Sequence, residues 1–264
     1  MELKLTNYAV EGGIATIAMN SPKNLNAVND AMCEELLYNF AQAEADEAVK
    51  VIVLKGLPRA FSAGGDIGMM AEILKDPNAS IADETMEVVA KVTNTMKSMS
   101  KVVITSVSGA AAGAGVGLAL SGDFCICAEN VKFILAFVNL GLCPDTGAAY
   151  LIAKAANPAL AVDLAMTGRP MDAEEAYKAG LVYKVVDNDE LEEATYKLAK
   201  RLAAGPVISY KNTKKQIYAA AFADYWTWLR EVEGPTQFEC SKTADFREGV
   251  TAFIEKRKAN FQGK

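Results

Sequence analysis

The sequence predicts an α/β protein built as a spiral of ββα units and followed by a helical C-terminal region. Strand, strand and helix recur with roughly regular spacing up to residue 136, which favours a spiral over a doubly wound sheet. Val49–Lys55 (VKVIVLK) is a near-continuous apolar run, as expected of a strand that is covered on both faces. From Asp163 onward the pattern is mostly helical.

The first unit rests on turn and capping signals. Thr6–Asn20 is predicted to form a hairpin of two short strands around Glu11-Gly12-Gly13. Asn29 is placed to cap a helix over Ala31–Glu44, whose apolar residues share one face. The strand at Val49–Lys55 follows this helix.

The later units repeat this order. Asp76-Pro77-Asn78 is expected to separate two helices, the second of which covers Asp83–Ser98. The strand Val102–Val107 leads into a glycine-rich turn and a helix, and paired short strands follow at Phe124–Ala128 and Lys132–Ala136.

The rest of the chain is predicted to be helical apart from a short strand at Leu181–Val186. We divide the protein into a ββα core, residues 1–200, and a helical region, residues 201–264. The aromatic residues of the second region suit either a clasp on the core or an oligomer interface. Lys214 and Lys215 are expected to be solvated.

Composition and charge exclude several classes of protein. The 264 residues are 51% hydrophobic and 23% charged, which is typical of a soluble globular protein. A net charge of −6 argues against a nucleic-acid partner, and the first residues lack the apolar block of a signal peptide, so we expect a cytoplasmic protein. The uncharged Val102–Gly122 is rich in glycine and alanine, and we interpret it as buried strand, turn and helix rather than a membrane span.

The absence of histidine limits the chemistry further. Without an imidazole the chain has no Ser–His or Cys–His mechanism and no histidine ligand for a metal. No two of the five cysteines form a CxxC pair, and we expect all five to be reduced, small core residues. Acid–base chemistry therefore falls to other side chains, among them Asp and Glu.

Two glycine-rich stretches follow predicted strands, Ala60–Ile67 (AFSAGGDI) and Gly109–Gly117 (GAAAGAGVG). If one N–H group from each turn met at a point, the two would form an oxyanion hole for a carbonyl oxygen. Neither stretch has the spacing of a nucleotide-binding loop, so a phosphate cradle is the weaker alternative. A third interpretation is that these glycines only permit close helix–sheet packing.

Asp145 stands in the otherwise uncharged stretch LGLCPDTGAAY. Its first interpretation is a helix cap, because Asp145 or Thr146 precedes a helix predicted near Ala148. Its second is a base in a dry pocket, where apolar neighbours would raise its pKa above the usual value of about 3.9. The residues alone do not decide between these two roles.

Several stretches together resemble the crotonase (enoyl-CoA hydratase/isomerase) superfamily over nearly the whole chain. They are AFSAGGDI, AAAGAGVGLALSGD, KFILAFVNLGLCPD, AEEAYKAGLVYKVV and the terminal DFREGVTAFIEKRKANFQGK. The resemblance implies a crotonase-like spiral core, a helical trimerisation region, and a trimer or dimer of trimers. It also implies an acyl-CoA thioester substrate, with coenzyme A as part of the substrate, and no metal or redox cofactor.

Carried over by position, the resemblance gives a set of site residues. The oxyanion N–H groups would be those of Gly65 and Ala114, where the family often has glycine at the second position. The substrate- and CoA-binding positions would be Lys23, Leu25, Ala27, Ala63, Asp66, Ile67, Phe137, Phe253 and Lys256. The last two would close the CoA site, either in the same chain or from a neighbouring subunit.

Departures from the family pattern indicate which reaction to expect. A typical hydratase of the family uses two glutamates, and this chain has Gly117 and Phe137 at those positions. The setting of Asp145 resembles that of the phenylacetate-pathway enoyl-CoA isomerases, which place one acid there. One carboxylate suits an allylic proton shift, with Asp145 as catalytic residue beside the N–H groups of Gly65 and Ala114.

Other functions remain open on this basis. One is a hydratase-like lyase with non-standard acid and base groups, and another is a non-catalytic acyl-CoA-binding protein. An aryl-CoA dehalogenase with Asp145 as nucleophile is weaker, because those enzymes need a histidine and the chain has none. Methionines within Gly68–Ser98, such as Met70 and Met96, are expected to line an adaptable acyl pocket or to be core residues.

Overall fold

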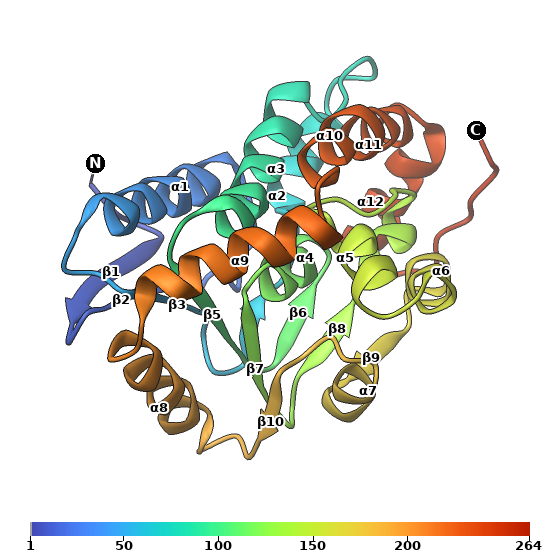
Figure 1. Cartoon of the computed structure of the whole chain (residues 1–264). Helices are drawn as coiled ribbons and strands as arrows, with labels where there is room; N and C mark the ends of the chain where they lie inside the picture. Colours follow the sequence, from blue (N-terminus) through green and yellow to red (C-terminus); the bar gives the residue numbers. More distant parts are fainter. Residues whose placement is uncertain (1) are drawn as a thin grey trace.

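The computed structural model describes residues 2–264, whose strands form two sheets (Figure 1). In hydrogen-bonded order, the six-stranded sheet consists of β1 (Thr6–Glu11), β2 (Ile14–Met19), β3 (Val51–Lys55), β5 (Val102–Val107), β7 (Phe124–Ala128) and β10 (Lys184–Val186). The four-stranded sheet consists of β4 (Ala60–Ser62), β6 (Ala110–Ala112), β8 (Lys132–Ile134) and β9 (Pro170–Asp172).

Helices cover these sheets and fill the C-terminal part of the chain. The helices of the first part are α1 (Asp30–Ala45), α2 (Ile67–Ile73), α3 (Asp83–Ser98), α4 (Ala114–Leu120), the 3₁₀ helix η1 (Ala136–Leu140), α5 (Ala148–Ala155), α6 (Pro158–Thr167) and α7 (Ala173–Lys178). The later helices are α8 (Leu191–Ala203), α9 (Val207–Ala221), α10 (Tyr225–Trp228), the π-helix η2 (Leu229–Glu233), α11 (Gly234–Ser241) and α12 (Ala244–Glu255).

The predicted spiral of ββα units is confirmed, and the two sheets explain it. The first strand of each later unit (β3, β5 and β7) lies parallel to its neighbour in the large sheet, while the second (β4, β6 and β8) enters the small sheet. The sequence had suggested that β7 and β8 pair with each other. They do not, because they lie in different sheets. The residues between them carry the chain from one sheet to the other, and β8 ends at Ile134 because η1 begins at Ala136.

The first unit forms as predicted. Gly12 and Gly13 turn the hairpin with φ of 57° and 80°, a region that glycine adopts without strain. Asn29 caps α1, and its side-chain oxygen accepts the N–H of Met32 at 3.0 Å.

Two expectations for the later chain were wrong. The strand predicted at Leu181–Val186 is shorter, because the N–H of Leu181 donates to the carbonyl of Ala176 in α7 and the ladder with β7 covers only Lys184–Val186. Lys214 is buried rather than solvated, since its ammonium group lies 2.9 Å from the Asp123 carboxylate and also donates to backbone carbonyls.

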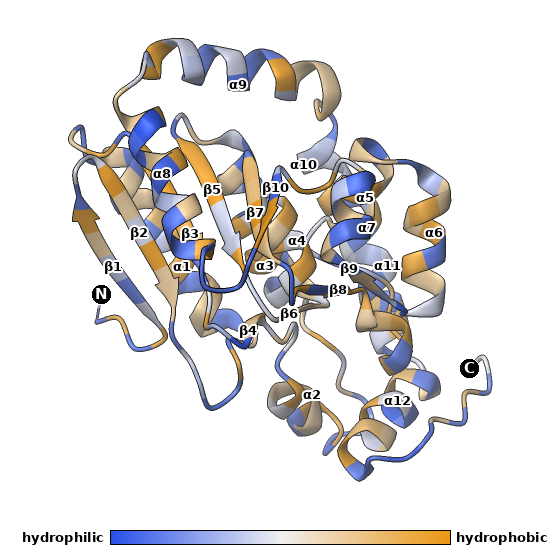
Figure 2. Cartoon of the chain, turned by 90° about the horizontal axis from the view of Figure 1, so that it is seen from below, coloured by the Kyte–Doolittle hydropathy of each residue, from blue (hydrophilic) through white to orange (hydrophobic). Residues whose placement is uncertain are grey.

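The C-terminal helices pack on the core of the same chain. Tyr225, Leu229, Phe246 and Val250 are buried in the main hydrophobic cluster, so the tail is a clasp on the core. Figure 2 shows α12 beside α2 at one end of the molecule, and the two helices are in contact. The division at residue 200 and a role of the tail in an oligomer stay predictions.

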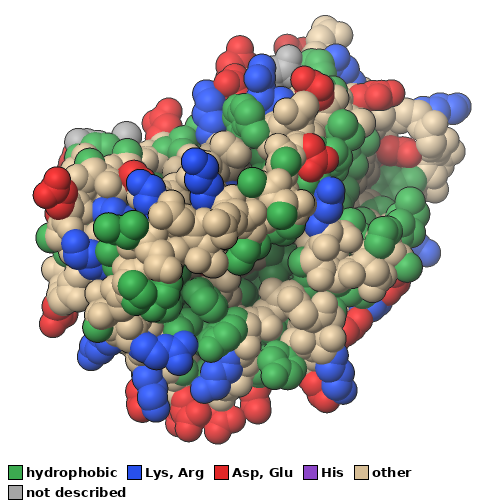
Figure 3. Space-filling model, in the orientation of Figure 1, with side chains coloured by type: hydrophobic (Ala, Val, Ile, Leu, Met, Phe, Trp, Pro, Cys, Tyr) green, Lys and Arg blue, Asp and Glu red, His purple; other side chains and the backbone are tan. Residues whose placement is uncertain are grey.

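The surface charges, the burial of the cysteines and the lengths of the helices also bear on the expectations from the sequence. On the face seen in Figure 3, basic and acidic side chains are interspersed, with acidic ones gathered along the lower edge. Three cysteines are buried as expected, whereas Cys143 and Cys240 are only half-buried. Within residues 2–264, no helix combines the length and the apolar character that a membrane crossing requires.

Candidate active site

The two glycine-rich turns meet through close backbone contacts. Gly64 has φ of 89°, and a β-carbon there would lie 2.6 Å from the carbonyl oxygen of Ala112. A β-carbon on Gly115 would lie 2.9 Å from Ser62, so the start of α4 packs directly on β4. Glycine at these points lets the turn after β4 and the turn after β6 touch, which brings the neighbourhoods of the two predicted oxyanion donors together.

The predicted donors keep their N–H groups available. Among the backbone hydrogen bonds of residues 2–264, none has the N–H of Gly65 or of Ala114 as its donor. Ala114 is the first residue of α4, where N–H groups lack an intrahelical partner and favour a negative charge. Two free donors on adjoining turns are what an oxyanion hole requires.

The segment with the predicted CoA positions Leu25 and Ala27 is held against the turn after β4. Leu25 adopts a left-handed conformation with φ of 55°, and its carbonyl accepts the N–H of Ala63 at 2.9 Å. Asn26 is fully buried and its side chain donates to the carbonyl of Phe61 at 3.1 Å. Leu25, Ala27 and Ala63 are therefore brought together.

The other predicted CoA-binding residues lie around this segment. Lys23 is exposed on it, and Ile67 is half-buried at the start of α2. Phe253 and Lys256 are exposed at the end of α12, which lies beside α2 of the same chain. These four side chains make no polar contact with one another among the described residues.

Asp66 has a structural use that the sequence did not reveal. Its carboxylate caps α2 by accepting the N–H of Gly68 at 2.9 Å, and it accepts the side-chain amide of Asn29 at 2.8 Å. The carboxylate thus ties α2 to the start of α1.

The turn that carries Asp145 rests on α4. Thr146 and Gly147 both have positive φ, 56° and 72°, and the Thr146 hydroxyl lies within hydrogen-bond reach of the Ala114 carbonyl at 3.2 Å. A β-carbon on Gly117 would lie 2.4 Å from the backbone oxygen of Thr146. The space in which a hydratase glutamate would begin is therefore filled by this turn.

The carboxyl of Asp145 is buried although part of the residue is exposed. Its Oδ1 has no hydrogen-bond partner in the described part of the chain, and its Oδ2 accepts the Gln237 side-chain amide at 3.4 Å. Burial raises the pKa of Asp145 to about 7, and the Gln237 amide and the nearby Thr146 side chain lower it in part. Such a carboxyl is suited to accept and return a proton near neutral pH.

The helix-cap interpretation of Asp145 is wrong. Helix α5 begins at Ala148 after Gly147, and no side chain caps it. The Asp145 carboxylate points instead toward Gln237, and the Thr146 hydroxyl points toward α4.

Apolar side chains lie beside the two turns. The ring of Phe137 is buried and lies 3.7 Å from the position of a β-carbon on Gly113. The terminal methyl of Met70 lies 2.7 Å from the position of a β-carbon on Gly65. Met70 is thus next to a predicted oxyanion donor, whereas Met96 is fully buried in the core.

Two residues near Asp145 were missed from the sequence. Gln237 is 1% exposed, and its side-chain oxygen accepts the N–H of Cys143 at 3.1 Å, which fixes the amide that donates to Asp145. Glu233 is 4% exposed, and each of its carboxyl oxygens lies 3.0 Å from the N–H of Gly147. Both come from the aromatic tail, where no motif marked them and about ninety residues separate them from Asp145.

Comparisons with known proteins agree on one family. Residues 9–264 match the family model described as enoyl-CoA hydratase/isomerase. The chain is 37% identical to the trans-2-decenoyl-[acyl-carrier-protein] isomerase of Streptococcus mutans over the full length of both proteins. It is 36% identical to the 1,2-epoxyphenylacetyl-CoA isomerase of Escherichia coli, with 97% of each chain covered. It is 32% identical to the short-chain-enoyl-CoA hydratase of Clostridium acetobutylicum, covering 98% of this chain and 97% of that protein.

Solved structures share the fold. The crystal structure of an enoyl-CoA hydratase from Mycobacterium avium subsp. paratuberculosis superposes with a TM-score of 0.89 at 30% identity, covering 99% of this chain and 100% of the other. A methylmalonyl-CoA decarboxylase has a TM-score of 0.84 at 23% identity over both whole chains, which shows the likeness of fold alone.

Proposed function

The chain belongs to the enoyl-CoA hydratase/isomerase family, and on this premise we propose that it is an isomerase that shifts the double bond of an enoyl thioester. The observation that carries the proposal is the carboxyl of Asp145, which is buried, has one oxygen without a partner among the described residues, and has its pKa raised to about 7 by burial. A base with these properties matches proton transfer at neutral pH.

The reaction begins at the thioester carbonyl. The N–H groups of Gly65 and Ala114 hold its oxygen and thereby acidify the α-carbon. Ionised Asp145 removes the α-proton, and the electron pair delocalises into a dienolate whose charge rests on the held oxygen. The protonated Asp145 then returns the proton to the γ-carbon, and the double bond moves by one position.

Three features favour isomerisation over hydration. Addition of water by the family's usual route requires two glutamates, and this chain has Gly117 and Phe137 at those positions. The Asp145 turn occupies the space beside Gly117, and the ring of Phe137 is apolar. A single proton carrier needs no activated water.

The remaining site residues are proposed to bind the carrier group. Backbone around Leu25, Ala27 and Ala63 would receive the adenine and pantetheine of coenzyme A, with Asp66 and Ile67 alongside. The side chains Lys23, Phe137, Phe253 and Lys256 would complete the site. An oligomer of three or six subunits, a cytoplasmic location, and the lack of a separate cofactor belong to the same proposal.

The test compares wild-type protein with Asp145→Asn on 3-enoyl-CoA and 2-enoyl-CoA esters. We expect wild type to move the double bond and Asp145→Asn to be slower by about 1,000-fold or more, because the amide cannot accept the proton. Hydration is followed in the same reactions, and acyl-carrier-protein thioesters are run in parallel because one relative is named for such a substrate. Equal rates for the two proteins, or 3-hydroxyacyl-CoA as main product, would refute the isomerase assignment.

A further inference from the structure

Glu233 is a buried acid that the proposed reaction does not use. It ends η2, is 4% exposed, and forms no ion pair with any described residue. A carboxyl is seldom buried without a cation or a specific role. Its surroundings therefore require an explanation.

The polar contacts of Glu233 converge on the turn of the catalytic acid. Each carboxyl oxygen lies 3.0 Å from the Gly147 nitrogen, two residues after Asp145, so the carbonyl oxygen of a neutral acid can accept that N–H. Helix α10 also contacts this turn, because the Tyr225 hydroxyl donates to the Thr146 carbonyl at 3.3 Å. On its other side the Thr146 hydroxyl lies 3.2 Å from the Ala114 carbonyl in α4 and 2.6 Å from the backbone carbonyl of Asp145.

Gly147 is fixed by sterics as well as by this hydrogen bond. Its φ of 72° lies in the left-handed region, and a β-carbon there would lie 2.1 Å from the Tyr225 hydroxyl oxygen. Two successive left-handed residues, Thr146 and Gly147, persist only where the surrounding structure holds them. Glu233 supplies the hydrogen-bond acceptor for the second of these residues.

We propose that Glu233 is a positioning residue for Asp145, which holds the turn of residues 145–147 through the N–H of Gly147. The inference rests on the proposed proton transfer by Asp145 and adds the residue that orients that base. Glu233 touches neither the substrate nor the reacting atoms in this role.

The surroundings of Glu233 favour its neutral form. Burial and the nearby Asp145 raise the pKa of Glu233 well above its usual range, since two carboxylates cannot both ionise readily in a dry site without a cation. The titratable group that faces Glu233 from α10 is Tyr225, whose pKa is itself raised by burial. From α3, Glu87 lies with Arg230 in an open surface pocket on η2 and α11.

The neutral acid has a consequence for turnover. A second negative charge beside Asp145 would repel the dienolate and oppose its formation. We therefore expect activity to rise as Asp145 ionises and to fall at alkaline pH as Glu233 ionises.

The test uses three variants of the full-length protein, with isomerisation of a 3-enoyl-CoA ester measured from pH 5 to pH 10. Glu233→Ala leaves the Gly147 N–H without an acceptor, so the Asp145 carboxyl is no longer held in position. We expect kcat to fall roughly 10- to 100-fold with little change in KM. Glu233→Gln keeps an acceptor and loses the ionisable group, so it should retain kcat within about 3-fold at pH 7 and lack the alkaline limb. Glu231→Gln, an exposed acid in the same helix, should match wild type throughout.

Two results would overturn the inference. One is a Glu233→Ala protein with wild-type kcat, and the other is a Glu233→Gln protein that keeps the alkaline limb. Thermal unfolding of each variant identifies a folding defect, and the near-isosteric glutamine variant remains informative if alanine does not fold.

A readout that does not depend on activity separates this inference from the proposed function. Carboxyl ¹³C NMR titration of wild type should show two coupled carboxyls with raised pKa, and Glu233→Gln should leave a single one. If wild type moves no double bond, the proposed function fails while this titration still decides the charge state of Glu233. A Glu233 carboxyl that ionises near its usual pKa would overturn the neutral-acid assignment.

Discussion

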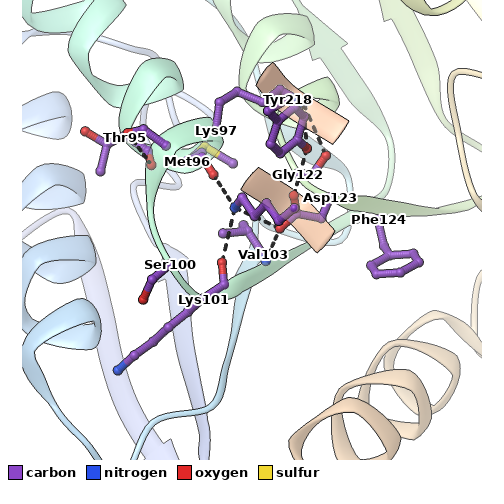
Figure 4. A network of polar contacts seen from close by, with 12 residues as sticks. Thr95, Met96, Lys97, Ser100, Lys101, Val103, Gly122, Asp123, Phe124 and Tyr218 are labelled. Carbon is purple, nitrogen blue, oxygen red and sulfur yellow. Dashed lines mark hydrogen bonds and ion pairs between the residues drawn. The ribbon is translucent and has the colours of Figure 1, made fainter. Parts of the chain in front are cut away.

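Two buried clusters of charged residues in this chain differ in whether a cation and hydrogen bonds balance the charge of their carboxyls. Asp123 lies in a network beneath α9, where it pairs with the Lys214 ammonium at 2.9 Å and accepts the Tyr218 hydroxyl at 2.7 Å and the Val103 N–H at 2.8 Å (Figure 4). Lys97 is buried in the same network and donates to backbone carbonyls, and burial lowers its pKa to about 8. Asp145 and Glu233, by contrast, lie together with no ion pair among the described residues.

We interpret the Asp123 cluster as structural and the Asp145 cluster as part of the proposed active site. Around Asp123 each charge meets an opposite charge or several hydrogen bonds, which is the condition for a buried ion pair to be tolerated. Around Asp145 one carboxyl oxygen has no hydrogen-bond partner in the described part of the chain, and burial raises its pKa. A buried carboxyl without a cation or a full set of hydrogen bonds lowers the stability of the protein. The same environment gives it a pKa near neutrality, which suits a base.

The largest expected effect comes from breaking the compensated cluster. Lys214→Met leaves Asp123 buried without its cation, so we expect the free energy of unfolding to fall by about 4 kcal/mol at pH 7. Urea denaturation of this variant is compared with Lys215→Met, whose parent side chain is exposed. A Lys214→Met protein as stable as Lys215→Met would show that the ion pair does not hold α9 in place.

A second variant tests whether the Asp145 turn requires that residue 117 has no side chain. Gly117→Ala places a β-carbon 2.4 Å from the backbone oxygen of Thr146, and we expect a loss of about 3 kcal/mol through overpacking. Gly234→Ala serves as control because its new β-carbon would meet only ordinary contacts, the nearest at 3.4 Å. If both variants unfold at the same urea concentration, the Asp145 turn does not depend on the missing side chain at 117.

The third prediction is a gain in stability rather than a loss. The pKa of Asp145 is about 7 in the folded protein and about 3.9 in an unfolded chain, so the folded state binds the proton more tightly and wild-type stability falls as pH rises between these values. At pH 8 this penalty is about 4 kcal/mol. Asp145→Asn removes it but buries an amide without its full set of partners, which costs about 2 kcal/mol, so the variant should be more stable by about 2 kcal/mol at pH 8 and the gain should disappear by pH 5. Unfolding at the two pH values measures it, and a loss of stability at pH 8 would contradict the uncompensated charge.

How far the sequence predicts these clusters depends on the distance between their members along the chain. Local signals were sufficient for the hairpin at Thr6–Asn20, for the Asn29 cap and for the helix at Asp83–Ser98, because turn and capping residues act within a few positions. Asp145 stood out as an acid in an uncharged stretch. The contacts that define its role were not predictable in this way.

The failures share a physical cause. Lys214 carries no local sign of burial, and its partner Asp123 is 91 residues away. Glu233 and Gln237 reach Asp145 only because the aromatic tail folds back over the core, and nothing in their own neighbourhood marks them. The pairing of β7 and β8 was wrong because consecutive short strands entered different sheets.

The smallest expected effect concerns the amide that orients the base. The Gln237 hydrogen bond lowers the pKa of Asp145, so Gln237→Leu should raise that pKa further and reduce the ionised fraction below neutrality. We expect isomerisation at pH 6 to slow by about 3-fold and to recover at pH 8.5. Gln262→Leu, in the exposed C-terminal segment, is the control, and an equal loss at both pH values would indicate a general structural defect.

The most direct test of the central claim is the pH dependence of kcat/KM for double-bond migration by the wild-type protein. This quantity reports the ionisation of the free enzyme. A buried, uncompensated Asp145 predicts that kcat/KM rises with the ionisation of one group whose pKa is about 7, and that this rise is absent from the residual activity of Asp145→Asn. A rate that is flat from pH 5 to pH 8, or one that is already maximal at pH 5, would contradict it.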